Sequence, residues 1–104
     1  GRPAEPAEPG EPGEPGDRER AVRRLLYRSK QRGWLEMDIL VGEWAEAHLP
    51  RMSPAELREF SRFLDEENPD MFKWITGQAD PPPHVAEMQV FRALGGYVRG
   101  KMAP

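Results

Sequence analysis

Few side chains of this sequence have the types and spacings that catalysis needs. Glu36 and Asp38 are carboxylates two residues apart, a pattern from which an acid–base pair could be built. On a helix, however, residues two apart do not face each other, so these carboxylates cannot act together on one substrate atom. The two histidines, His48 and His84, are far apart in the chain, and neither belongs to a metal-ligand pattern.

The sequence also lacks the motifs of nucleotide-binding and hydrolytic enzymes. It contains no G-x-x-x-x-G-K-S/T loop, no G-x-G-x-x-G fingerprint and no G-x-S-x-G elbow. It has no cysteine, which excludes thiolate catalysis and cysteine-ligated metals. We therefore predict no catalytic residue, no metal site and no independent enzymatic activity, and the sequence identifies no cofactor-binding residue.

Charge is distributed very unevenly along the chain. Residues 18–32 carry seven positive side chains and one negative one, whereas residues 33–70 carry three positive and ten negative ones. Such separation favours a charge-guided contact with a partner. The basic run could bind nucleic acid, but Tyr27 is its only aromatic residue, and stacking aromatics are typical of single-strand binders. A solvated or partner-facing helix is the better interpretation.

The first sixteen residues differ in composition from the remainder. They alternate proline with glutamate and glycine and contain no large apolar residue, so they cannot bury enough surface to offset the entropy of ordering. We predict a disordered acidic tail over residues 1–16, a helical domain over 17–99 and a frayed end over 100–104. No apolar run reaches the roughly 20 residues that a membrane-spanning helix needs.

Apolar residues recur at helical spacing in the remaining chain, and no segment alternates as a strand would. The fold class is therefore predicted as all-α, a small bundle of four to five short helices. The expected helices cover residues 17–32 and 35–49, a segment that begins at Ser53, and residues 70–76 and 85–98. The expected core residues are Val22, Leu25, Leu26, Met37, Leu40, Val41, Trp44, Ala45, Leu57, Phe60, Phe63, Leu64, Met71, Phe72, Trp74, Ile75, Met88, Phe91, Leu94 and Val98.

Helix-start signals support these boundaries. Ser53, with proline next and Glu56 three residues on, is typical of a capping box. Asp17 is the expected N-cap of the first helix, and Asn68, also followed by proline, is the expected N-cap of the fourth.

The charge changes sign at a corner between the first two predicted helices. Gly33 follows the basic run and can adopt a left-handed turn without a Cβ penalty. Trp34 comes next, and it either folds back onto the bundle or stands out as an anchor for a partner. We predict that this corner is the partner-binding surface.

The residues around this corner resemble a known family. The segments R-L-L-Y-R-S-K-Q-R-G-W-L-E-M-D over residues 24–38, E-N-P-D over 67–70 and W-I-T-G-Q over 74–78 are similar to the flavinylation factors of succinate dehydrogenase. This family comprises the mitochondrial assembly factor 2 proteins and a short bacterial counterpart. Its signature is R-G-x-x-E, here Arg32, Gly33 and Glu36, and the resemblance covers residues 20–99.

The resemblance implies a helical assembly chaperone that is not an enzyme. Such a factor binds the flavoprotein subunit of succinate dehydrogenase and promotes covalent attachment of FAD to a histidine of that subunit. The resemblance implies partner contacts at Arg32, Gly33 and Glu36, to which Trp34 and Arg28 are added by proximity.

The same resemblance carries expectations about cofactor, partners and location. FAD would belong to the client, and the factor would be a monomer that binds no nucleic acid and no membrane. We expect the mitochondrial matrix, with the bacterial cytoplasm as the alternative. A general helical adaptor, or a stable accessory subunit of a larger respiratory complex, is the alternative function.

Overall fold

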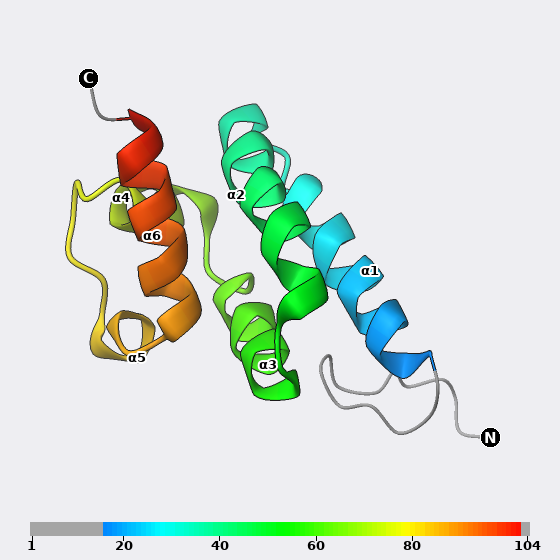
Figure 1. Cartoon of the computed structure of the whole chain (residues 1–104). Coiled ribbons are helices and arrows are strands. Elements are labelled where there is room, and N and C mark those ends of the chain that lie inside the picture. Colours follow the sequence, from blue (N-terminus) through cyan, green and yellow to red (C-terminus); the bar gives the residue numbers. More distant parts are fainter. Residues whose placement is uncertain (1–15, 103–104) are drawn as a thin grey trace.

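The computed structural model describes residues 16–102. All of the regular secondary structure within these residues is helical (Figure 1). The predicted all-α class is confirmed. The tail predicted over residues 1–16 lies outside the described residues except for Gly16, as do residues 103 and 104. The elements are α1 (Asp17–Lys30), α2 (Leu35–His48), the 3₁₀ turn η1 (Leu49–Arg51), α3 (Pro54–Phe63), α4 (Asn68–Ile75), α5 (Pro83–Ala86) and α6 (Gln89–Met102).

The first two helices form an antiparallel hairpin, against which α3 and α6 pack, while α4 and α5 pack against α6 (Figure 1). α1 and α2 lie side by side, and α6 contacts α2, α3 and α4. Gly42 permits the close approach of α1 to α2, because a Cβ added there would lie 2.9 Å from Cγ of Lys30. This glycine therefore serves the packing of the hairpin at some cost in helix propensity.

The predicted apolar stripes form the core. Most of the expected core residues are buried, and Val22, Leu26, Leu40, Phe72 and Trp74 are partly buried against them. Aromatic contacts join the helices: the ring centroids of Trp44 and Phe60 lie 5.6 Å apart, and those of Phe63 and Phe91 lie 6.0 Å apart. The core thus links α2 to α3 and α3 to α6.

The helix starts agree only partly with the predictions. The capping box of α3 is confirmed, because the Glu56 backbone N–H donates to Ser53 Oγ at 3.1 Å and the Ser53 N–H donates to Glu56 Oε1 at 2.8 Å. The N-cap predicted at Asp17 is wrong by one residue. Gly16 takes this position with a φ of 92°, and Asp17 lies inside the helix, where its carboxylate pairs with Arg20.

The helix predicted over residues 85–98 is wrong at both ends. The chain turns after α5, and α6 begins afresh at Gln89 and continues to Met102. A carboxylate from α3 supports this second start, because the Val90 N–H donates to Glu59 Oε1 at 2.9 Å. Fraying was expected from residue 100, but residues 100–102 are helical.

The capping box gives a direct test of how α3 is stabilised. We expect Ser53→Ala to lower the free energy of unfolding by about 1 kcal/mol, because the first turn of α3 loses its side-chain acceptor. Urea unfolding followed by circular dichroism measures this change. Ser53→Thr keeps the hydroxyl and is the matched control, so an equal loss in both variants would contradict the capping explanation.

Candidate functional site

The corner between α1 and α2 has the left-handed turn that the sequence predicts. α1 ends at Lys30, two residues earlier than expected, and Gly33 has a φ of 84°. Gly33 is exposed, and a Cβ added there would meet nothing within 4 Å. The backbone conformation therefore favours glycine, while the space above the glycine is open to a partner.

Arg32 holds this corner to the loop between α3 and α4. Its Nη1 donates to the carbonyl of Leu64 at 3.0 Å, and its Nη2 donates to the carbonyl of Glu66 at 2.7 Å. Its Nε donates to Oδ1 of Asn68. One planar guanidinium thus bonds to three positions of a segment more than thirty residues away in the sequence.

The backbone of Arg32 is fixed as well. Its carbonyl accepts from Nδ2 of Asn68 at 3.0 Å, and its N–H donates to Oδ1 of Asp38 at 2.6 Å. Arg32 and Asn68 therefore form a reciprocal pair, in which each residue donates to the other. Both polar groups of the residue that precedes Gly33 are engaged, which sets the direction in which the chain enters the turn.

Burial shapes the electrostatics of this residue. Desolvation lowers the pKa of the Arg32 guanidinium below its ordinary value, and the nearby charge of Arg28 lowers it further. The carboxylates of Asp38, Asp65 and Glu67 act in the opposite direction. The hydrogen bonds to carbonyl oxygens compensate in part for the loss of water around the charged group.

Asn68 has a different role from the one predicted for it. We expected its side chain to cap α4, but α4 begins at Asn68 itself, and Glu67 occupies the N-cap position without a side-chain cap. The amide of Asn68 is bound to Arg32 instead. The start-signal interpretation was wrong because a long-range partner competes for the same side chain. The sequence signal available for this contact was that Asn68 lies in the E-N-P-D segment of the family resemblance.

Arg28 also joins α1 to α3. Its Nη1 donates to Oγ of Ser61 at 3.0 Å, and its Nη2 donates to Oδ1 of Asp65 at 2.7 Å. The Arg28 side chain is therefore directed at α3, whereas Gly33 is open to solvent. The partner contact predicted for Arg28 stays a prediction. In the structure, Arg28 joins α1, the helix that leads into the corner, to α3 and the residues just after it.

Trp34 and Glu36 differ in their exposure and in their contacts with the rest of the chain. Trp34 is partly buried, and its ring centroid lies 5.1 Å from that of Phe72, so it folds back onto α4 while staying partly exposed. Glu36 is exposed on the first turn of α2, and within residues 16–102 no hydrogen bond or ion pair engages its carboxylate. Among the predicted contact residues, Gly33 and Glu36 are the ones left open.

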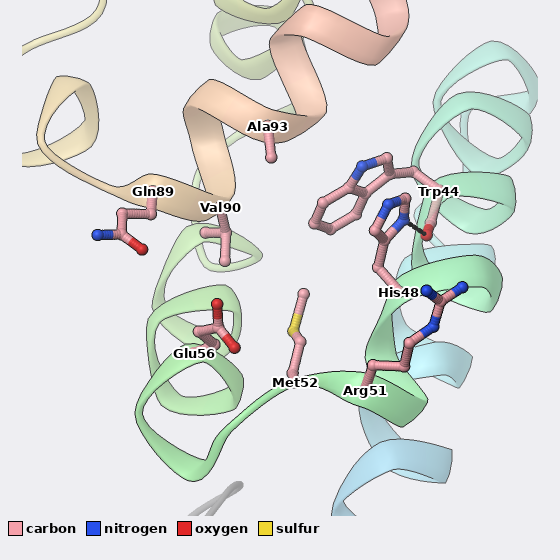
Figure 2. Close-up of a pocket in the computed structure, with 8 residues that line it drawn as sticks. All are labelled: Trp44, His48, Arg51, Met52, Glu56, Gln89, Val90 and Ala93. Atoms are coloured by element: carbon pink, nitrogen blue, oxygen red, sulfur yellow. Dashed lines mark hydrogen bonds between the residues drawn. The ribbon is translucent and has the colours of Figure 1, made fainter.

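A separate cavity of about 400 Å³ lies between α2, α3 and α6 (Figure 2). Its lining combines apolar and polar side chains: Trp44, His48, Arg51, Met52, Glu56, Gln89, Val90 and Ala93. His48 stacks on Trp44 at 4.5 Å, and its Nδ1 donates to the Trp44 carbonyl at 2.9 Å, as the dashed line in Figure 2 shows. None of the predicted contact residues lines this cavity.

Two other kinds of site, a metal-binding cluster and a membrane-spanning helix, are absent from the described residues. Between residues 16 and 102, no group of three or more histidine, aspartate or glutamate side chains is arranged to hold a metal ion. Over the same stretch, no helix is long and apolar enough to cross a bilayer.

Replacing the arginine at the corner tests its supporting role. We expect Arg32→Lys to lower the free energy of unfolding by about 1–3 kcal/mol, because a lysine cannot reach three diverging acceptors and leaves partly buried carbonyls unpaired. Urea unfolding measures the change, with Arg24→Lys on the exposed face of α1 as the matched control. If Arg32→Lys and Arg24→Lys have the same free energy of unfolding, the hydrogen bonds of Arg32 contribute nothing to stability.

Comparison with known proteins places this sequence in a family. Residues 23–98 match a family model described as the flavinator of succinate dehydrogenase. A relative from Arabidopsis thaliana is 44% identical over 78 residues, which cover 75% of this chain and 42% of that protein. Relatives from Caenorhabditis elegans and Schizosaccharomyces pombe are 40% and 33% identical, over 78% and 81% of this chain and 70% and 60% of their own lengths.

All three relatives are named mitochondrial succinate dehydrogenase assembly factor 2. The chain spans less than half of the Arabidopsis protein and more than half of the other two. The matched region begins within α1 and ends within α6, so it contains the corner and everything that holds it. This chain therefore belongs to the family of succinate dehydrogenase flavinators.

Proposed function

We propose that this protein is an assembly factor that binds the flavoprotein subunit of succinate dehydrogenase and promotes its covalent flavinylation. The family match over residues 23–98 is the observation that carries the proposal. The names of the relatives support an assembly role, and they also favour a mitochondrial location. We assign the matrix as the place of action, with the bacterial cytoplasm as the alternative.

The corner supplies a rigid contact surface for such a client. Gly33 carries no side chain and is open, so a client surface can approach its backbone closely. Glu36 offers a free carboxylate about one helical turn away, which can accept charge-assisted hydrogen bonds. Three donors of the Arg32 guanidinium bond within the chain, so we assign Arg32 to positioning the turn.

The chain assists the reaction by selecting a conformation of its client. Covalent attachment requires that the flavin and the client histidine be held in one reactive geometry. A factor that binds this arrangement better than others increases its population. We assign FAD to the client, because the described residues contain no glycine-rich loop that could cradle its phosphates. The factor itself acts as a monomer and forms no covalent bond.

A bulky substitution at the corner tests the proposal. Gly33→Arg should abolish binding of the flavoprotein subunit in a pull-down and reduce the in-gel flavin fluorescence of that subunit, because the side chain covers the open backbone. The strained turn should cost about 1–2 kcal/mol of stability, and circular dichroism should still show a folded bundle. Retained binding by a folded Gly33→Arg variant would contradict the proposed contact.

The matched control is Gly77→Arg, since Gly77 has a similar φ of 82° in the turn after α4. It introduces the same charge at another left-handed turn, where a Cβ would also lie 3.3 Å from Cδ of Arg99, so circular dichroism must show that this variant is folded. We expect Gly77→Arg to bind the flavoprotein subunit. Flavin fluorescence that is equally strong without any factor would contradict the flavinylation role itself.

A further inference from the structure

Exposed apolar side chains gather beside the corner. Leu35, Ile39 and Met102 are 72%, 45% and 55% exposed, which is unusual for residues of this size. Leu35 and Ile39 lie one turn apart on the same face of α2. Met102 ends α6, whose last turn lies beside the start of α2 at the same end of the molecule (Figure 1). A single exposed leucine needs no explanation, but a group of apolar residues marks a contact surface.

The exposed face of α2 changes character along the helix. In its second half, Glu43 pairs with Lys101 at 3.5 Å and Glu46 pairs with Lys30 at 2.8 Å. In its first half, the exposed residues are Leu35, Glu36 and Ile39, and the carboxylate of Glu36 is unpaired within the described residues. Within the described residues, the exposed side chains in the half of α2 next to the corner thus have no polar partner, whereas those of Glu43 and Glu46 are paired.

A hollow of about 180 Å³ is bounded by two members of this apolar group, Ile39 and Met102, while Leu35 lies outside its lining. Its lining comes from three helices and consists of Glu36, Ile39, Leu40, Phe72 and Met102. Leu40 and Phe72 are partly buried and form the apolar part of the lining that is joined to the core. The thioether of Met102 is flexible, so this wall of the hollow can adapt to the shape of an inserted side chain.

The hollow is continuous with the corner through two shared residues. Phe72 lines the hollow and also contacts the ring of Trp34 at 5.1 Å. Glu36 lines the hollow and also belongs to the R-G-x-x-E signature. A partner that covers Gly33 and reaches Glu36 therefore meets the hollow without leaving the surface.

We propose that the hollow receives an apolar side chain of the flavoprotein client, and that Glu36 pairs with a lysine or arginine next to that side chain. The proposal rests on the proposed function and names the client chemistry that the factor recognises. The apolar lining fits the inserted side chain, and the unpaired carboxylate at the rim fits the neighbouring cation. The open backbone at Gly33 allows the client to approach closely, and the hollow determines which segment of the client binds beside it.

Titration of the purified flavoprotein subunit with variants of this protein tests the proposal. Leu35→Gln combined with Ile39→Gln should raise the Kd about tenfold or more, because the apolar contact is lost. Met102→Gln should raise the Kd several-fold. Tyr27→Gln is the matched control, since Tyr27 is 66% exposed on α1 and does not line the hollow, and its Kd should match that of the wild type.

A salt series tests the predicted cation. The Kd of the wild type should rise with salt concentration, and Glu36→Gln should reduce this dependence because one charge pair is removed. Circular dichroism establishes that each variant is folded. If the double variant does not fold, Met102→Gln carries the test, because it changes only the last described residue of α6.

The outcomes separate this proposal from the proposed function. If the hollow variants bind as the wild type does while Gly33→Arg fails to bind, the hollow proposal is overturned and the assembly role stands. If the wild type does not bind the flavoprotein subunit at all, the proposed function fails. Light scattering gives a further result that would overturn the hollow proposal: a wild-type dimer that becomes monomeric in the double variant would assign the surface to a second copy.

Discussion

The bonds between Arg32 and the loop before α4 are the constraint on which the functional surface depends. A turn of four residues between two helices has many possible geometries, and local sequence alone does not select one. The guanidinium selects it by bonding to two backbone carbonyls and one amide of a distant segment. Because these groups are partly buried, losing any of them leaves an unsatisfied polar atom, so the arrangement is held as a unit.

This constraint gives the residues of the R-G-x-x-E signature different roles. The arginine turns inward and is occupied, whereas the glycine and the glutamate face solvent. The sequence signature does not distinguish the roles of its three residues. In the structure, Arg32 supports the turn, whereas Gly33 and Glu36 are exposed to solvent. Trp34 lies between these roles, since its ring packs near that of Phe72 and the residue is only partly buried.

Features that depend on neighbouring residues were predictable from the sequence. The apolar stripes, the capping box at Ser53 and the left-handed turn at Gly33 all follow from local spacing and residue type. The inward role of Arg32, the partner of Asn68 and the separate start of α6 were not predictable in this way. Each depends on a bond between residues about thirty or more apart, and several polar partners compete for the same side chain.

The reciprocal pair of Arg32 and Asn68 has a consequence for biosynthesis. The ribosome delivers the complete signature well before it delivers Asn68, so the hairpin of α1 and α2 emerges with the Asp38 bond available but without the distant groups that bind the Arg32 guanidinium. Long-range closure is a late event in folding because the intervening chain must first be ordered. The nascent hairpin therefore carries Gly33 and Glu36 on a turn whose geometry is only partly fixed, and under the proposed function the client-binding surface is complete only once the α4 segment has been translated.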